Sequence, residues 1–281
     1  MENQTKGFLF VASLSHAYYE AAISCIRSLR DHYPDAKIAF FTHEMWIEER
    51  HKGLVDDLVL GIPVHVRAKL WCLDRTPYDI TCYVDVDGWF VSDDVQDIFE
   101  QLPADKGVVM TYNRAYNSKV VYHVAENVDY EGSPARELRH WKDDDMQLVK
   151  DGKAHQFRWH CGFFVWRKNQ LTSELWNKWI EIYKLHNDTK EGYRPYCRTL
   201  QFWDTFAFWR VLHENPHLND IVGKMDSQRW NFVNGYREKD EIEEGKEMVF
   251  YHYSIGEEAR KGGYIRESDI PLENGTWRVL K

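Results

Sequence analysis

Apolar residues in the first part of the chain form short continuous runs with one amphipathic segment between them. Residues 7–12 and 37–42 are such runs, which are typical of strands buried on both faces of a parallel sheet. Residues 17–32 between them place their apolar side chains on one face of a helix, and Pro34 ends that helix. The strand–helix–strand order predicts an α/β fold, whose ligands bind beyond the carboxyl ends of the strands.

The same patterns predict the remaining elements. Strands are expected at residues 64–66, 81–84, 89–91, 107–111, 155–167 and 248–253, and helices at residues 67–73, 95–102, 171–185 and 199–213. Residues 113–155 are polar and lack periodic apolar positions, which predicts an insertion or long loop that could shape a substrate site. We therefore expect one α/β domain over residues 1–281, with a central, mostly parallel sheet flanked by helices.

Composition narrows the functional classes. The formal net charge is −9 without a long basic run, so a dedicated nucleic-acid binder is disfavoured. The chain has no stretch of eighteen apolar residues and a polar N-terminus, so we expect neither a signal peptide nor a membrane span. Five scattered cysteines without CxxC spacing predict reduced, mostly structural thiols in a cytoplasmic protein.

Two common motifs are missing and a third is misleading. The chain lacks the glycine-rich G-x-G-x-x-G motif of dinucleotide folds and the G-x-x-x-x-G-K-[ST] motif of phosphate-loop ATPases. His213 to His217 matches the letters of the zinc-peptidase motif H-E-x-x-H, which requires one continuous helix. Pro216 interrupts that helix, so the segment is predicted to be a helix terminus.

Two carboxylates follow the predicted strand at residues 81–84. Asp85 and Asp87 are separated only by Val86, and acids at the end of a buried strand suit a hard divalent cation such as Mg²⁺ or Mn²⁺. A simple turn is the alternative, because Asp-Gly pairs are common in loops.

Two further positions could carry chemistry. Asp204 lies within an otherwise aromatic and apolar segment, either as a helix cap or as a residue that points into a site. His252 ends a predicted strand and is followed by Gly256 and Lys261. A glycine followed by basic side chains is what a phosphate-contacting loop requires.

Together these features resemble glycosyltransferases of the GT-A fold, in particular the family 8-like group that includes glycogenin and bacterial galactosyltransferases. The resemblance implies that Asp85-Val86-Asp87 is the DxD motif and that His252 completes a Mn²⁺ or Mg²⁺ site. The family's H-x-x-G-x-x-K-P-W segment resembles residues 252–261, although the glycine comes one position later and no Pro-Trp follows. Arg260 or Arg266 could replace Lys261 as the diphosphate contact.

The resemblance also implies roles for residues elsewhere in the chain. Asp204 opens a helix near the donor sugar, and His160 stands where the family has an asparagine that contacts the sugar. The donor-binding residues would be Ala12, Ser13, Ser15, Lys69, Asp85, Val86, Gly162, Gly256 and Lys261.

The implied reaction transfers a sugar from a nucleoside diphosphate, with UDP expected, to an acceptor hydroxyl. The family implies retention of anomeric configuration; in an inverting enzyme, Asp204 would be the candidate general base. A saccharide is the default acceptor, and a hydroxylated base in DNA is an alternative that a local basic patch would have to support. A non-catalytic nucleotide-sugar binding protein is the third hypothesis, disfavoured by the presence of both acids.

Overall fold

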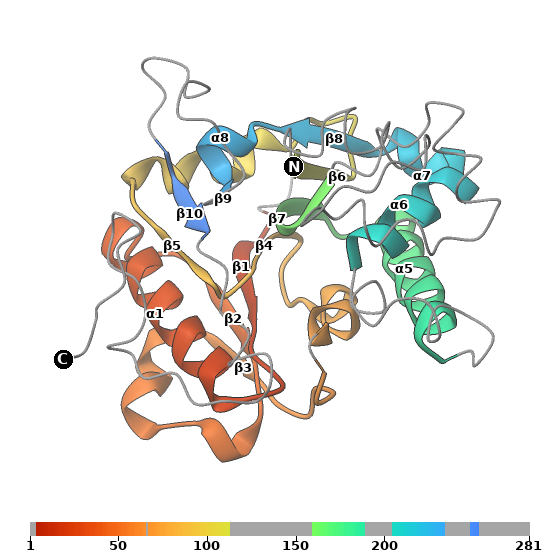
Figure 1. Cartoon of the computed structure of the whole chain (residues 1–281). Coiled ribbons are helices and arrows are strands. Elements are labelled where there is room, and N and C mark those ends of the chain that lie inside the picture. Colours follow the sequence, from red (N-terminus) through yellow and green to blue (C-terminus); the bar gives the residue numbers. More distant parts are fainter. Residues whose placement is uncertain (1–3, 66, 113–158, 189–203, 234–247, 253–281) are drawn as a thin grey trace, which may run out of the picture.

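The central sheet has the strand order β3-β2-β1-β4-β7-β6-β8 (Figure 1). The computed structural model describes residues 4–65, 67–112, 159–188, 204–233 and 248–252. The strands of this sheet are β1 (Lys6–Val11), β2 (Ile38–Phe41), β3 (Asp57–Val59), β4 (Ile80–Val84), β6 (Val108–Tyr112), β7 (Trp159–Arg167) and β8 (Val222–Met225). Strands β1 to β4 are mutually parallel and β6 is parallel to β8, while β7 runs antiparallel to both β4 and β6. The predicted α/β class and mostly parallel sheet are confirmed.

A second, smaller sheet begins shortly after the carboxyl end of β4. It contains β5 (Gly88–Phe90), β10 (Phe250–His252) and β9 (Phe232–Val233) in the order β5-β10-β9. Strand β10 is antiparallel to β5, with His252 opposite Gly88. A Cβ atom on Gly88 would lie 2.5 Å from the carbonyl oxygen of Tyr251, so this pairing depends on glycine.

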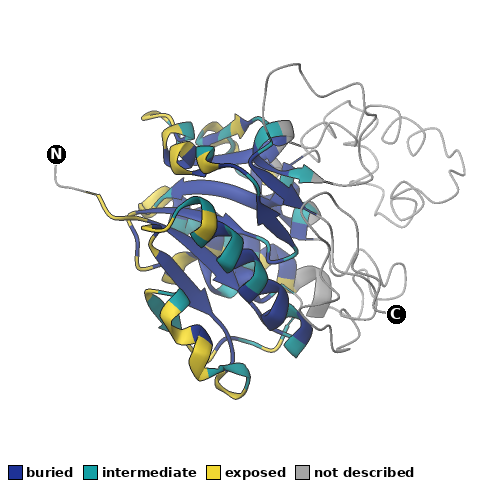
Figure 2. Cartoon of the chain, turned by 90° about the vertical axis from the view of Figure 1, so that its left-hand side faces the viewer, coloured by how far each residue is buried: buried dark blue, intermediate teal, exposed yellow. Residues whose placement is uncertain are grey.

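Helices cover both faces of the central sheet. Helix α1 (His16–His32) and the 3₁₀ helix η5 (Asp93–Gln101) pack on one face, where they share a core with Phe8 and Phe10 of β1. The other face is covered by α5 (Gln170–Asp188), α6 (Asp204–Glu214) and the short η3 (Ala68–Trp71) and η4 (Leu73–Arg75), which pack with Leu9. Side chains alternate between the two faces of a strand. Because helices cover both faces of the sheet, both sets of side chains of β1 are buried, which explains why its run of residues is apolar throughout (Figure 2).

The remaining described elements are short. They are η1 (Glu44–Trp46), η2 (Glu49–Leu54), α7 (Pro216–Asp220) and α8 (Ser227–Trp230). Helix α6 ends at Glu214 and α7 begins at Pro216, which confirms that the His213–His217 segment is a helix terminus. Proline is favoured at this first helical position because its missing N–H would have no intrahelical partner there.

Some local predictions were wrong. Residues 64 and 65 are not in a strand, and the outer strand is β3 instead. Strand β3 has only one neighbour, so three half-buried residues suffice and leave no marked apolar run. The helices predicted at 67–73 and 95–102 are 3₁₀ turns.

Other predictions fall partly or wholly outside the described residues. The loop region 113–155, the single-domain boundary that depends on it, and residues 155–158, 199–203 and 253 are among them. Within the described part, Cys25, Cys72, Cys82 and Cys161 are buried free thiols, as expected. No described helix is long and apolar enough to span a bilayer.

Candidate metal and sugar-nucleotide site

The two predicted acids lie where β4 leaves the central sheet. The backbone N–H of Asp85 donates to the carbonyl of Gly162 on β7 at 2.7 Å, which holds the chain in place just after the strand. Val86 turns its side chain into the core, while the carboxylates of Asp85 and Asp87 on either side of it remain partly exposed. The strand therefore presents two acids at its carboxyl end, as the interpretation of residues 85–87 as a DxD motif requires.

His252 reaches these acids through the small sheet. Because it pairs with Gly88, its imidazole lies beside the residue before that glycine, with Nε2 3.1 Å from Asp87 Oδ1. The ligand atoms of Asp85, Asp87 and His252 all lie within 4.8 Å of one another. Two carboxylates and one imidazole match the ligand preferences of Mn²⁺, and carboxylates also bind Mg²⁺. The residues present thus suit a divalent cation.

Electrostatics favour a positive charge beside Asp87. Burial by itself lowers the pKa of His252, but the negative charge and hydrogen bond of Asp87 outweigh burial and raise it. A cation at this position would take the place of that proton, because a metal-ligating imidazole must be neutral at the ligating nitrogen.

Lys69 links the acid pair to Asp204. Its ammonium group lies 2.6 Å from Asp204 Oδ2 and 3.2 Å from Asp85 Oδ1, and it donates to the carbonyl of Cys161 at 2.7 Å. Burial lowers the pKa of Lys69, but Asp204 and Asp85 outweigh burial and raise it, so the side chain is charged. The ammonium thus contacts three protein oxygens, by hydrogen bonds to Asp85 and Cys161 and by an ion pair with Asp204. The predicted contact between Lys69 and a donor substrate stays a prediction.

Asp204 is a buried, ionised carboxylate in the first described turn of α6; its role as the acid that opens the helix stays a prediction, because residues 189–203 lie outside the described residues. Its Oδ1 lies 3.4 Å from Arg67 Nε and accepts a hydrogen bond from the Thr205 N–H at 3.1 Å. Burial raises its pKa, but the positive charges of Arg67 and Lys69 outweigh burial and lower it. Trp179 donates its indole N–H to the Asp204 carbonyl at 2.8 Å, which anchors this helix end to α5.

His160 is neutral and its tautomer is set by its neighbours. Its Nδ1 accepts from the Gly162 N–H at 3.1 Å and from the side-chain amide of Asn231 at 2.7 Å. The proton of the neutral ring is therefore on Nε2. Burial, followed by the charges of His252 and Lys69, lowers the pKa of His160 to about 3. His160 can therefore donate a hydrogen bond from Nε2, but with this low pKa its ring does not take up a second proton at neutral pH.

Asn231 connects the two histidines. Its carbonyl oxygen lies 3.2 Å from Nδ1 of His252, and its amide also donates to Thr111 Oγ1 at 3.1 Å. When this oxygen accepts a hydrogen bond from the Nδ1–H of His252, the other ring nitrogen, Nε2, faces Asp87. Asn231 could not be selected from the sequence, because it belongs to no motif and acts through contacts between distant segments.

Tyr83 and Arg67 were also missed. The Tyr83 hydroxyl donates to Asp85 Oδ1 at 2.6 Å and Arg67 pairs with Asp204. Tyr83 points toward Asp85 because residues two apart lie on the same side of a strand. The alternation of side chains along this strand was therefore the sequence signal that could have identified Tyr83.

Gly162 is close-packed against the site. A Cβ atom there would lie 2.6 Å from Asp85 Oδ2 and 2.7 Å from Cε1 of His160, so any other residue would displace a carboxylate or an imidazole. The other predicted loop residues, Gly256 and Lys261, lie outside the described residues.

The β1–α1 loop lies at the same edge of the sheet, because β1 and β4 are paired neighbours. Ala12, Ser13 and Ser15 are buried, and Leu14 between the serines has a φ of 73°. Ser13 donates its hydroxyl to the carbonyl of Pro63 at 2.6 Å and accepts from the His65 N–H at 3.1 Å; His43 Nε2 lies 3.0 Å away. The Ser13 hydroxyl is fully engaged within the protein, so a donor contact by this residue would use its backbone.

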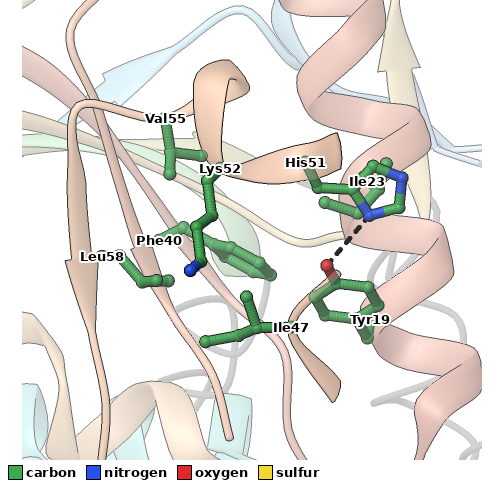
Figure 3. A pocket seen from close by; sticks show the side chains of 8 residues that line it. All are labelled: Tyr19, Ile23, Phe40, Ile47, His51, Lys52, Val55 and Leu58. Carbon is green, nitrogen blue, oxygen red and sulfur yellow. Dashed lines mark hydrogen bonds between the residues drawn. The ribbon is translucent and has the colours of Figure 1, made fainter. Parts of the chain in front are cut away.

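A small cavity lies apart from these residues, between α1, β2, β3 and η2 (Figure 3). It is lined by Tyr19, Ile23, Phe40, Ile47, His51, Lys52, Val55 and Leu58. None of these residues belongs to the predicted site.

The architecture and the position of the acids define a GT-A fold. Solved structures show this likeness, whereas no family model and no curated protein sequence matches the chain. The bifunctional glycosyltransferase WbbM in its apo form superposes with a TM-score of 0.56 at 13% identity, over 90% of this chain and 46% of that one. Glycosyltransferase GlyE of Streptococcus pneumoniae TIGR4 gives 0.46 at 15% identity, over 79% of this chain and 46% of that one.

Galactosyltransferase LgtC, in complex with donor and acceptor sugar analogs, gives a TM-score of 0.44 at 15% identity, over 88% of this chain and 86% of that one. The chain spans about half the length of WbbM and GlyE. At these identities the likeness to WbbM shows the fold, and function has to be argued from the site.

Proposed function

We propose that this protein is a metal-dependent glycosyltransferase that moves a sugar from a nucleoside diphosphate, UDP in the first instance, to an acceptor hydroxyl. The observation that carries the proposal is the convergence of Asp85, Asp87 and His252 at the carboxyl edge of a GT-A sheet. Three potential ligands from two distant segments meet there, at the edge where α/β sheets bind their ligands.

Asp85, Asp87 and Nε2 of His252 would hold Mn²⁺ or Mg²⁺. A cation bound there would stabilise the negative charge that develops on the leaving diphosphate. The protein prepares this position in advance: Lys69 and Tyr83 fix Asp85, and Asn231 fixes the ring of His252. The β1–α1 loop at the neighbouring strand end is the proposed nucleotide-binding segment.

Asp204 and His160 are the proposed sugar-side residues. Two cationic partners hold the pKa of Asp204 below its usual value, so it is a poor general base but a persistent negative charge. A persistent negative charge suits stabilisation of positive charge at the anomeric carbon, which supports retention over inversion. His160, with its proton on Nε2, is the proposed hydrogen-bond donor to a sugar hydroxyl.

A saccharide hydroxyl is the proposed acceptor, with residues 113–155 as the acceptor-side segment. Nothing in the site favours a hydroxylated base in DNA. The basic residues that could support that alternative are Arg136, Arg139, Lys142, Arg260, Lys261 and Arg266, which lie outside the described residues, and the net charge of −9 opposes it.

A turnover screen tests the proposal. The full chain is incubated with nucleoside-diphosphate sugars, with and without Mn²⁺ and with and without a panel of saccharide acceptors, and release of the nucleoside diphosphate is measured. We expect Mn²⁺-dependent turnover of one donor, lowered about 100-fold or more by Asp87→Asn, since even residues behind metal ligands contribute about 10–100-fold. Asp105→Asn is the matched control, because Asp105 is an exposed acid remote from the metal ligands.

Two results would overturn the proposal in different ways. Absence of turnover by the wild type with every donor and acceptor would refute the enzyme and leave a sugar-nucleotide binding protein. Equal turnover by wild type and Asp87→Asn would refute the metal role of the acid pair.

A further inference from the structure

A second group of metal-ligating side chains lies beside the first turn of α1. His16, Glu20 and Glu48 place one ligand atom each within 4.8 Å of the other two. None of the three takes part in the Asp85–Asp87–His252 group, and they come from a different pair of segments: the start of α1 and the residue just before η2.

The spacing along α1 creates half of this group. His16 and Glu20 are four residues apart and therefore share one face of the helix, with His16 Nε2 3.6 Å from Glu20 Oε1. That separation is too long for a hydrogen bond. It is close to the about 3.4 Å expected between two ligands of a tetrahedral Zn²⁺ with bonds of about 2.0–2.1 Å.

Tyr19 places Glu48 next to this helix face. The backbone N–H of Glu48 donates a hydrogen bond to the Tyr19 hydroxyl at 3.2 Å. That hydroxyl also forms a hydrogen bond with His51 Nδ1 at 2.9 Å (Figure 3). Tyr19 is almost fully buried, so it fixes the backbone at Glu48 against α1. The third ligand is therefore held in position by contacts that do not involve its own carboxylate.

Burial and charge also suit a cation. Glu20 is buried, whereas His16 and Glu48 are partly exposed and so give access from solvent. The two carboxylates supply the negative charge that a cation requires. The Arg50 guanidinium binds Oε2 of Glu48 at 2.7 Å, so Arg50 would compete with a cation for that oxygen.

We propose that His16, Glu20 and Glu48 form a second divalent-cation site, one that takes Zn²⁺ with solvent as the fourth ligand. One imidazole and two carboxylates are within the range of ligand sets that bind Zn²⁺. The ion would join the first turn of α1 to the segment before η2, and so stabilise the fold at the segment that follows the β1–α1 loop. This site does not depend on the proposed enzymatic activity.

Zinc binding by the full chain tests the proposal. Protein stripped with chelator is dialysed against Zn²⁺, bound metal is measured by elemental analysis, and thermal unfolding is followed with and without Zn²⁺. We expect Glu20→Gln to bind one equivalent fewer than the wild type and to lose most of the Zn²⁺-induced rise in melting temperature. Glu49→Gln, which neutralises an exposed glutamate next to Glu48, should behave as wild type.

Asp87→Asn separates the two sites, because it should retain the Zn²⁺ equivalent and melting-temperature rise that Glu20→Gln loses. His16→Gln provides a second variant in case Glu20→Gln does not fold, and should show the same loss. The proposal is overturned if the wild type binds no Zn²⁺, or if the folded variants at positions 20 and 16 bind as much as the wild type.

Discussion

Single hydrogen bonds decide which atoms of the site can bind a cation or donate a proton. The side-chain oxygen of Asn231 accepts a hydrogen bond from the Nδ1–H of His252, and its amide N–H groups donate hydrogen bonds to His160 and Thr111. Both histidines are thereby held in one tautomer, with His252 directing Nε2 at Asp87 and His160 retaining a proton on Nε2. One buried amide thus sets the orientation of a proposed metal ligand and of a proposed sugar contact.

Replacing Asn231 should weaken cation binding without removing a ligand. Asn231→Ala leaves His252 without its hydrogen-bond acceptor, so we expect Mn²⁺ affinity to fall about 10–100-fold. Asn231→Asp keeps an acceptor for Nδ1 and should retain most of the affinity. Titration of free Mn²⁺ by electron paramagnetic resonance measures both, and equal affinity in Asn231→Ala and the wild type would contradict this role.

Lys69 is expected to contribute strongly to stability because it is buried between two acids. Lys69→Met leaves the carboxylates of Asp204 and Asp85 without their shared cation. Breaking a buried pair from one side costs about 3–5 kcal/mol, which denaturant unfolding would measure. Lys37→Met is the control, because Lys37 pairs with Asp56 at the solvent-exposed surface, where loss of an ion pair changes stability far less than loss of a buried one. Similar losses in both variants would refute the buried network.

The pH dependence of stability should contain a contribution from His43. Burial lowers its pKa in the folded state, whereas the unfolded side chain titrates near about 6.5. As pH falls, the unfolded state therefore takes up the proton at a higher pH than the folded state does. The contribution of His43 to stability is full above about pH 6.5 and is lost as pH falls through the lower pKa of the folded state.

His43→Gln removes this titration. The difference in unfolding free energy between wild type and His43→Gln should be larger at pH 7.5 than at pH 5.5. A difference that grows as the solution is acidified would have the wrong sign and would contradict the buried, neutral state of His43.

At the scale of elements, the pairing of β5 with β10 assembles the site. Asp87 immediately precedes β5 and His252 ends β10, so the antiparallel register that sets His252 opposite Gly88 also sets it beside Asp87. The sequence predicted both segments as apolar runs, but their pairing is a contact between distant parts of the chain. This pairing requires glycine at position 88, and that requirement becomes visible only once β10 is known to lie opposite it.

Gly88→Ala should separate these strands. The added Cβ would meet the Tyr251 carbonyl oxygen at 2.5 Å, so overpacking of about 1–3 kcal/mol and a drop of about 10-fold or more in Mn²⁺ affinity are expected. Gly53→Ala is the control, because a Cβ there has open space around it. Calorimetric Mn²⁺ titrations compare the two, and an unchanged affinity in folded Gly88→Ala would show that the register does not position His252.

The burial of each element determines whether it could be predicted from the sequence. Strands β1, β2 and β4 are covered on both faces and show as continuous apolar runs. Strands β3 and β8 are only partly buried and β9 has two residues, so these strands left little trace in the sequence. The reversal of β7 against β4 and β6 was equally invisible, because apolar patterning does not encode strand direction. The acid pair and His252 were predictable from residue type and motif, while the contacts of Lys69 and Asn231 depend on the folded structure.

Over the described part of the molecule, a buried core lies on each face of the central sheet, and the acids lie at the carboxyl edge of that sheet. The chain has the fold of GT-A glycosyltransferases, while the choice of donor and acceptor belongs to the proposed function. We propose that Asp85, Asp87 and His252 bind a divalent cation that in turn binds a nucleoside diphosphate.

The most direct test is calorimetric titration of the protein with UDP in the presence of Mn²⁺ and, separately, of EDTA. We expect the wild type to bind UDP with Mn²⁺ at least about 10-fold more tightly than with EDTA, and this difference to be absent in Asp87→Asn. UDP binding of equal affinity under both conditions, or the same Mn²⁺ dependence in Asp87→Asn, would contradict it.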